Sequence, residues 1–371
     1  MTANSESMKL HKISTFCAAV ACAAAFTGSD AVACTSAIVS GRASASGRPL
    51  LWKNRDTGQQ HNFVERVNTG RPGELAYVGL FNAGDSLLSE AWMGMNEAGF
   101  AIMNTASYNL APDTAAVKDR EGLVMSRALQ VCRTVDDFAR LLDTLPKPLG
   151  VQANFGVIDA TGAGAYFETD DYRYTPFYLS ESEDGVIIRT NFSRTGNATD
   201  GMGYIRCDNA RHLLADRISN GGFVPEDFTE TCSRSYWHSL LGRDVLADTT
   251  QHWAVDQDFI PRHSTSASVV IEGVMPGGDP SDCVMWTMLG YPGTAHIEAV
   301  TLDKVPETVR PTLPGWRSEA SETSLKLRDT RVFPIHRGSG QHYIDLDYLR
   351  TEVPRQRALS TSAYRRARSR R

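Results

Sequence analysis

The chain has 371 residues, of which 42% are hydrophobic, 22% charged and 9% aromatic, and this globular composition excludes a fibrous or wholly disordered protein. The formal net charge of −5 argues against a general nucleic-acid binder, which would present a basic surface. The length is enough for one large domain or two ordinary ones with a sizeable core.

The N-terminus has the pattern of a secretory signal. A basic start precedes a short, alanine-rich apolar run at residues 13–26, and residues 31–33 place small side chains at the two positions that a signal peptidase requires. The run is too short to span a bilayer stably, and no other apolar run reaches membrane length. We therefore predict a signal peptide at residues 1–33, cleaved between Ala33 and Cys34, and a mature protein that is periplasmic or secreted if the host is a bacterium.

The mature chain then reads as strands, two helices, strands, two helices and strands. Short β-branched or alternating segments bounded by turn residues predict strands at residues 34–41, 50–56, 76–81, 90–95, 100–104, 153–168, 172–179, 185–193, 264–274, 283–290 and 296–302. Apolar residues spaced near 3.6 predict helices at residues 120–132, 134–145, 204–218 and 225–241, with Thr134 as an N-cap. This order favours one domain of antiparallel sheets with helices outside, and the region after Pro306 is expected to be irregular.

The end of the chain differs in charge from the rest. Residues 355–371 contain seven arginines and no acidic residue. Such a run of like charge is typical of a solvated, disordered tail, and weak binding to an anionic surface is the alternative. We therefore expect a single catalytic domain over residues 34–354, followed by a basic, disordered tail.

Cys34 would be the first residue of the mature chain, so its thiol and a free α-amine would belong to one residue. An α-amine has a pKa of about 7.7–8.0, so a useful fraction is neutral at physiological pH and can accept the thiol proton directly or through one water. Nucleophile and base then come together without a histidine. Two alternatives stay open, which are lipidation of Cys34, for which Ala31 is a poor residue at the −3 position, and a disulfide.

The chain has seven cysteines, two of which lie within the predicted signal. Besides Cys34, the mature chain keeps Cys132, Cys207, Cys232 and Cys283. These four could form two bridges in any of three pairings or stay as buried thiols, and the sequence does not choose. No Cys-x-x-Cys pair is present, which argues against a zinc site.

Polar side chains follow several of the predicted strands. Asp56 ends the strand that returns from the first turn, so a hairpin would bring its carboxylate back near Cys34, where it could orient the α-amine; the alternative is a turn aspartate. Asn104 closes a hairpin, and Asn191 follows a buried-looking strand. A side-chain amide at a strand end is a fixed donor for the oxyanion of a tetrahedral intermediate, although an Asx turn explains each asparagine alone.

Five segments in this order resemble the linear amide C–N hydrolases of the N-terminal-nucleophile (Ntn) class, the group of choloylglycine (bile-salt) hydrolases, penicillin V acylases and acyl-CoA:6-aminopenicillanate acyltransferases. The segments are CTSAIVSG for the nucleophile strand, WKNRD, GMNEAGFAIMN, IIRTNFS and the helix start GYIRCDNARHLL. They run from Cys34 to Leu214, and the later STSASVVIEG and MWTMLG extend the resemblance over most of the mature chain.

The resemblance implies an α+β fold, a four-layer αββα sandwich with two mainly antiparallel sheets and helices outside. It implies that Cys34 is the nucleophile, that its α-amine is the base and that Asp56 holds the amine. It also implies that neither a metal nor an organic cofactor is needed.

The same resemblance implies roles for residues further along the chain. Asn191 would donate to the oxyanion with Asn104 as second support, and Arg206 would steady the site, with Arg211 of the same predicted helix as the alternative. Lys53 stands where bile-salt hydrolases and penicillin V acylases carry arginine. A lysine is a point charge and not a bidentate fork, so this position sets the chain apart from those relatives.

We therefore predict an exported amidohydrolase that cleaves a linear C–N amide through an acyl-enzyme on Cys34. The substrate is expected to be a small molecule, either an N-acyl amino acid, a bile-salt conjugate or a penicillin-like amide, and Lys53 and Arg55 are expected to bind it. Acyl transfer to a second amine and a homo-oligomeric state stay open. No nucleic-acid partner and no stable membrane span are expected.

Two other functions remain as alternatives. The first is an outer-membrane lipoprotein with a non-catalytic binding role, lipidated at Cys34. The second is a secreted cysteine protease that would use Cys283 with His263 or His296, and its activity would survive the loss of Cys34.

Overall fold

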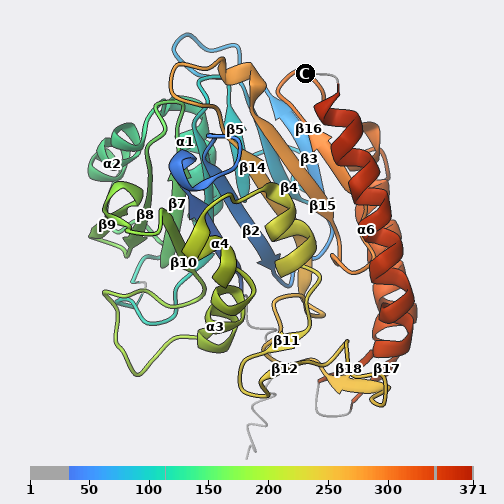
Figure 1. The fold of residues 1–371 in the computed structure, drawn as a ribbon. Helices are drawn as coiled ribbons and strands as arrows, with labels where there is room; N and C mark the ends of the chain where they lie inside the picture. Colours follow the sequence, from blue (N-terminus) through green and yellow to red (C-terminus); the bar gives the residue numbers. More distant parts are fainter. Residues whose placement is uncertain (1–32, 113, 338–340, 370–371) are drawn as a thin grey trace, which may run out of the picture.

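The computed structural model describes residues 33–112, 114–337 and 341–369. Of the predicted signal peptide, residues 1–32 therefore lie outside the described residues. Two large antiparallel sheets stack on one another, with helices on both outer sides (Figure 1).

The first sheet has six strands in the order β10-β1-β2-β14-β15-β16. Its strands are β1 (Thr35–Val39), β2 (Leu50–Asp56), β10 (Val186–Arg189), β14 (Thr265–Glu272), β15 (Val284–Leu289) and β16 (Ile297–Val300). β1 lies between β2 and β10, with Ser36 opposite Lys53 on one side and Arg189 on the other. The strand that follows Cys34 is therefore hydrogen-bonded along both edges.

The second sheet has seven strands that follow one another in chain order. They are β3 (Asn62–Val67), β4 (Tyr77–Asn82), β5 (Met93–Asn96), β6 (Ala101–Ala106), β7 (Ala153–Ile158), β8 (Gly164–Thr169) and β9 (Tyr174–Tyr178). Strands that follow each other in sequence pair antiparallel, and two helices are inserted between β6 and β7. The remaining short strands, β11 (Trp237–His238), β12 (Arg243–Asp244), β13 (Trp253–Val255), β17 (Ile335–His336) and β18 (His342–Asp345), form two small sheets.

Three apolar clusters separate the four layers of the fold. The longer helices are α1 (Glu121–Val131), α2 (Val135–Thr144), α3 (Tyr204–Leu213), α4 (Ala215–Asn220), α5 (Glu319–Leu327) and α6 (Leu346–Arg368). Alternate residues of β2 show the layering, because Leu51 packs between the two sheets whereas Trp52 packs on the outer side with Ala210 of α3 and Tyr364 of α6. On the opposite outer side, Phe138 of α2 belongs to the cluster that covers the seven-stranded sheet. The expected αββα sandwich is therefore confirmed.

The helices at 120–132 and 134–145 are confirmed, the one predicted at 204–218 is divided at Leu214 into α3 and α4, and the one expected at 225–241 does not form. Thr134 caps α2 through a capping box with Asp137, which satisfies the first free N–H groups of the helix. In the 225–241 segment, only a π-helical stretch, Asp227–Cys232, forms before the chain turns into β11. The buried guanidinium of Arg234 donates to the carbonyl of Pro292 at 2.8 Å, which ties the chain to a neighbouring loop where the helix would have continued.

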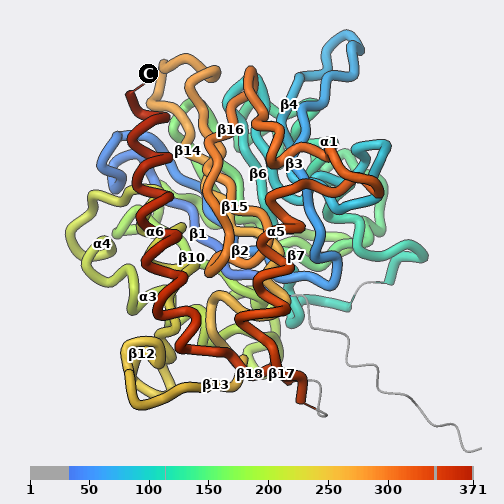
Figure 2. Tube along the Cα trace, turned by 90° about the vertical axis from the view of Figure 1, so that its right-hand side faces the viewer, coloured from blue at the N-terminus to red at the C-terminus, as the bar shows by residue number. Residues whose placement is uncertain are grey.

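The basic segment at the end of the chain is helical, so the disordered tail expected from residue 355 and the domain boundary at 354 were wrong. α6 runs along the outside of the six-stranded sheet (Figures 1 and 2). It buries Gln356, Ser360 and Tyr364, which recur every four residues and form an inward stripe among the arginines. The region after Pro306 is likewise not irregular throughout, because it contains α5 as well as α6.

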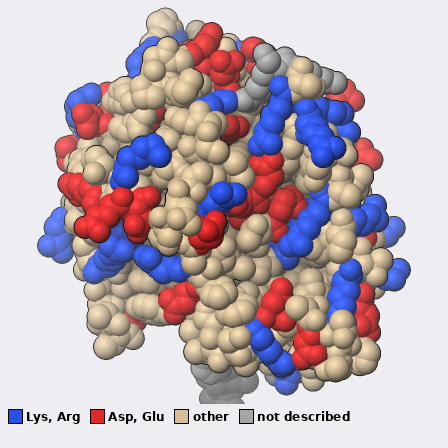
Figure 3. Space-filling view, viewed as in Figure 1, with Lys and Arg blue, Asp and Glu red and all other residues tan. Residues whose placement is uncertain are grey.

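The arginines of α6 do not form a patch of one sign. Arg355 pairs with Glu352 of the same helix. Arg368 pairs with Glu226, which lies in a neighbouring segment of the chain. On the face in view in Figure 3, acidic and basic side chains are interspersed, including along α6. A general anionic-surface site is not supported by this distribution.

None of the five cysteines of the described residues forms a disulfide, and all five are buried, which answers the question that the sequence left open. Within residues 33–112, 114–337 and 341–369, no helix is both long and apolar enough to cross a membrane. In the same ranges, no group of three or more His, Cys, Asp or Glu side chains is placed to hold a metal ion.

Candidate active site

The pairing of β1 with β2 brings Asp56 back to Cys34. The two strands are antiparallel, with Thr35 opposite Asn54, so the last residue of β2 reaches the residue that precedes β1. The Cys34 thiol lies 3.8 Å from the backbone carbonyl oxygen of Asp56, to which it donates, and Cys34 is 3% exposed. The hairpin predicted from the sequence therefore places these two residues side by side.

The Asp56 carboxylate is buried and is held by three side chains. Its Oδ1 accepts hydrogen bonds from Thr265 Oγ1 at 2.6 Å and Asn54 Nδ2 at 3.1 Å, and its Oδ2 accepts one from Arg262 Nε at 2.9 Å. Burial raises the pKa of Asp56, while the guanidinium groups of Arg262 and Arg206 act in the opposite direction. The carboxylate of Asp56 is thus held rigidly in place by three hydrogen-bond donors.

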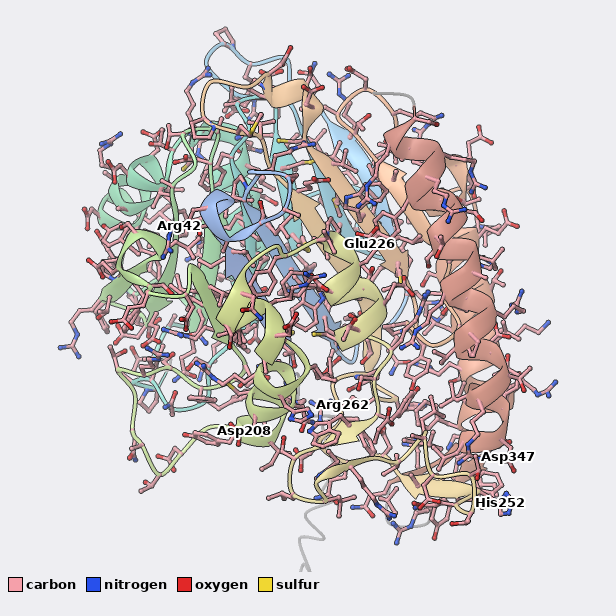
Figure 4. The ribbon with its side chains drawn as sticks, viewed as in Figure 1. Arg42, Asp208, Glu226, His252, Arg262 and Asp347 are labelled. Atoms are coloured by element: carbon pink, nitrogen blue, oxygen red, sulfur yellow. The ribbon has the colours of Figure 1, made fainter. Side chains whose placement is uncertain are left out.

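Arg262 is the residue that the sequence analysis missed. It lies in the loop before β14, at the lower end of the molecule beside α3 (Figure 4). Besides Asp56, it reaches the carbonyl oxygen of Ala33, to which its Nη2 donates at 3.3 Å. Arg262, which is paired with Asp56, therefore also binds the Ala33–Cys34 peptide group, the bond that removal of the predicted signal would break.

Arg206 rather than Arg211 belongs to the site. Its buried guanidinium donates through Nη1 to the carbonyl of Cys34 and to Thr35 Oγ1 (3.0 Å), and through Nη2 to Asn191 Oδ1 (2.9 Å). Burial lowers the pKa of Arg206 to about 10. Arg211 is exposed on the same helix, where its side chain interacts with Cys207.

The two asparagines differ in how their amides are used. Asn191 is fully buried, its Oδ1 accepts from Arg206, and its Nδ2 donates to the carbonyl of Ala106 at 2.7 Å. Asn104 accepts through Oδ1 from Lys53 Nζ at 2.7 Å. Its Nδ2 has no acceptor among the described residues, and Asn104 lines the cavity beside Cys34, whereas Asn191 does not. The amide that faces the cavity is therefore that of Asn104, which the sequence had placed second.

A cavity of about 1150 Å³ opens beside the nucleophile candidate. Its inner wall includes Cys34, Lys53, Arg55, Asp56, Trp92 and Asn104. None of the other four described cysteines lines it. The cavity is thus large enough for a small-molecule substrate, and the Cys34 side chain is accessible from it.

Lys53 and Arg55 supply two buried cations to this wall. Arg55 donates to Asn82 Oδ1 (2.8 Å) and Asn62 Oδ1 (3.0 Å), and its guanidinium lies 5.1 Å from the centre of the Trp92 ring. Burial lowers the pKa of Arg55 to about 10 and that of Lys53 to about 8. In the part of the chain that the structure describes, neither forms an ion pair with a carboxylate, so their positive potential is directed at Cys34 and the cavity.

Cys283 does not support the protease alternative. It is fully buried in the apolar cluster between the two sheets, where a substrate cannot reach its thiol. His296 is exposed on the surface instead.

No family model and no curated protein matches the chain. Solved structures do. An N-acylethanolamine-hydrolyzing acid amidase ortholog from Caenorhabditis elegans is 14% identical over 67% of this chain and 95% of its own, with a TM-score of 0.43. A single-residue variant of conjugated bile acid hydrolase from Clostridium perfringens is 13% identical over 73% and 93%, with a TM-score of 0.45. Penicillin V acylase from Agrobacterium tumefaciens is 14% identical over 73% and 87%, with a TM-score of 0.39.

Similarity at this level of identity and structural overlap carries no argument about the activity of this chain. What this chain does is inferred below from its own residues.

Proposed function

We propose that this protein is an exported amidohydrolase that cleaves a linear C–N amide with Cys34 as an N-terminal nucleophile. The observation that carries the proposal is the convergence on Cys34 of Asp56 at its thiol, Arg206 at its carbonyl and Arg262 at the preceding carbonyl, beside an open cavity. A purely structural cysteine would not need two arginines, Arg206 and Arg262, bound to the carbonyls on either side of its nitrogen. The proposal is favoured over a lipid anchor because Cys34, as a residue, is only 3% exposed and directly precedes β1, which is paired along both edges.

In the proposed reaction, the neutral α-amine of processed Cys34 takes the thiol proton, and the thiolate attacks the amide carbon of the substrate to form a C–S bond. The negative oxygen of the tetrahedral intermediate is held by side-chain amide N–H groups, and the α-ammonium gives its proton to the leaving nitrogen as the C–N bond breaks. A water molecule then attacks the thioester, its proton passes to the same amine, and the acid and the thiolate are released.

The charged side chains around Cys34 have further roles in the proposed reaction. Arg55 favours the thiolate and the oxyanion over their neutral forms, and it favours substrates that carry an anionic group. Arg262, paired with Asp56, binds the carbonyl of Ala33, the residue whose removal would create the α-amine of Cys34. N-acyl amino acids, bile-salt conjugates and penicillin V all combine an amide with an anionic group, and they are the proposed substrate class.

The proposal is tested on the protein recovered from the exporting host. N-terminal sequencing and intact mass should give a chain that begins at a free Cys34, whereas an added diacylglycerol mass would establish the lipoprotein instead. The processed protein should release amine from at least one class in a panel of N-acyl amino acids, bile-salt conjugates and penicillin V. Adding a second amine and looking for its acylated product measures acyl transfer.

Substitution of the nucleophile completes the test. Cys34→Ser should cut turnover severely, since an alcohol is a much poorer nucleophile than a thiol at neutral pH. Cys207→Ala, at another buried cysteine outside the cavity, is the matched control and should keep the activity. Near-normal turnover in the Cys34→Ser protein would refute the assigned nucleophile.

A further inference from the structure

Lys53 forms a bond between the two sheets at the edge of the cavity. It lies on β2 of the six-stranded sheet and is 2% exposed. Its Nζ donates to Asn104 Oδ1 at 2.7 Å and to the backbone carbonyl of Trp92 at 3.2 Å, and both of these residues belong to the seven-stranded side. A buried ammonium with two neutral acceptors is held in one place. If it moved away from either acceptor, a buried positive charge would lose a hydrogen bond that water cannot replace.

The bond from Lys53 fixes which end of the Asn104 amide faces the cavity. Only Oδ1 can accept from an ammonium, so Nδ2 and its two hydrogens must point the other way. Asn104 is 4% exposed, lines the cavity with Cys34, and finds no acceptor for Nδ2 among the described residues. A nearly buried donor without a partner, aimed at a cavity, indicates an acceptor that arrives with the substrate.

We propose that Lys53 is a positioning residue, which orients the Asn104 carboxamide so that its N–H donates to the oxyanion formed over Cys34. The inference rests on the proposed amidohydrolase function and deepens it. Lys53 acts here through Asn104 rather than by touching the substrate. Asn191, whose oxygen and one N–H are already bound within the protein, then serves to hold Arg206.

The geometry predicts the cost of removing the lysine. Without the ammonium, Asn104 Oδ1 would be left buried and unpaired, which disfavours that orientation of the amide. The amide therefore turns its oxygen toward the cavity, where it repels the oxyanion. Lys53→Met should lower kcat by about tenfold or more on a neutral amide substrate, with KM little changed, and Asn104→Ala should lower it by about 10²–10³.

A double-mutant cycle separates this role from direct action on substrate. If Lys53 acts through Asn104, adding Lys53→Met to Asn104→Ala should cause little further loss of kcat. Lys53→Arg keeps a cationic donor and should restore part of the activity. Lys304→Met, at an exposed lysine outside the site, is the control. Independent, multiplicative losses in the double variant, or an effect of Lys53→Met confined to KM, would overturn the proposal.

A second measurement does not depend on activity. In processed protein labelled with ¹⁵N-asparagine, the side-chain signal of Asn104, assigned with Asn104→Ala, should shift as Lys53 loses its proton near pH 8, the range to which burial lowers the pKa of Lys53. The shift should be absent in Lys53→Met. An identical titration in both proteins would overturn the positioning role. If the coupling is seen but no amide is cleaved, the proposed function fails while the orientation of Asn104 stands.

Discussion

Lys53, Arg55, Arg206 and Arg262 concentrate four cationic side chains around one cysteine, and only Asp56 among the residues described above pairs with any of them. Such a site lowers the stability of the folded state, because a charge that is buried loses its hydration. It becomes favourable when negative charge develops at Cys34, as in a thiolate or an oxyanion. Residues that lower the stability of the fold in this way are expected at a functional site rather than in a structural core.

The cost of Lys53 can be measured through its pH dependence. The unfolded chain keeps a lysine near its ordinary pKa of 10.5, whereas burial lowers the pKa of Lys53 to about 8 in the folded protein. Between these values the unfolded state binds more protons than the folded state, so the free energy of unfolding rises with pH through this window. We expect the contribution of Lys53 to rise by about 3 kcal/mol between pH 8 and 10.5.

The measurement is urea unfolding of the wild-type protein and the Lys53→Met variant at several pH values across this window. Other groups titrate in both proteins, so only the difference between the two free energies of unfolding is compared. That difference should move in favour of the wild type as the pH rises. A difference that stays constant would mean that Lys53 is not desolvated in the folded state.

The sequence could place Asp56 beside Cys34 because the two residues belong to one hairpin, and a hairpin is a local feature. Arg262 could not be found in that way, because it is 206 residues from Asp56 and becomes its neighbour only through the pairing of β14 with β2. The sequence offered only a chemical indication. A buried carboxylate needs a cation, and Arg262 lies two residues before the strand predicted at residues 264–274.

At the level of elements, the start of α3 is built to deliver Arg206. Gly203 is the N-cap of α3 and has a φ of 86°, a conformation that side chains other than that of glycine rarely adopt. A Cβ at this position would lie 2.3 Å from Arg206 Nη2. The glycine therefore makes room for the guanidinium that holds the carbonyl of Cys34.

Gly203→Ala should displace Arg206 and lower kcat/KM by about 10–100-fold, since a shift of about 1 Å in a positioning group has effects of this size. Gly242→Ala is the matched control, because Gly242 also has a positive φ (62°) but has open space around the added Cβ. Both variants should lose about 1–2 kcal/mol of stability from the backbone conformation. Equal activities of the two variants would show that Arg206 is not sensitive to this contact.

α6 shows why composition alone misled the prediction for the C-terminus. The count of arginines indicates a disordered tail, whereas the position of one aromatic residue decides the outcome. Tyr364 is 1% exposed, its ring centre lies 4.3 Å from that of Trp286, and its hydroxyl lies 2.8 Å from Thr229 Oγ1. Burial of this ring against the outer face of the sheet stabilises the helix despite its charge.

Tyr364→Ala should therefore lower the free energy of unfolding by about 3–5 kcal/mol, the range for removing a buried aromatic side chain. Leu359→Ala, at a position of the same helix that is 41% exposed, should change it by less than about 0.5 kcal/mol. Chemical denaturation of the two variants checks the pair. If Tyr364→Ala proved as mild as Leu359→Ala, the packing of α6 on the sheet would be in question.

For the whole molecule, the sandwich brings together groups that no single element contains. Cys34 and Asp56 belong to one hairpin of the six-stranded sheet, Asn104 lies within β6 of the other sheet, and Arg206 comes from an outer helix. The alternating strand and helix patterns predicted antiparallel sheets with helices outside, and the four-layer arrangement was predicted from the family resemblance. It could not predict which amide would face the cavity, because the Lys53–Asn104 bond crosses between the sheets and depends on how they stack.

In the proposed mechanism, activity depends on a proteolytic cleavage between Ala33 and Cys34 that should leave the fold unchanged. With Ala33 still attached, the nitrogen of Cys34 is an amide that cannot accept the thiol proton, while β1 keeps all of its pairing with β2 and β10. Purified protein that retains Ala33 before Cys34 should therefore show no detectable turnover, yet match the free energy of unfolding of the processed protein within about 1 kcal/mol. Paired activity assays and urea unfolding of the two forms check this. Full turnover by the form that keeps Ala33 would mean that the α-amine is not the base.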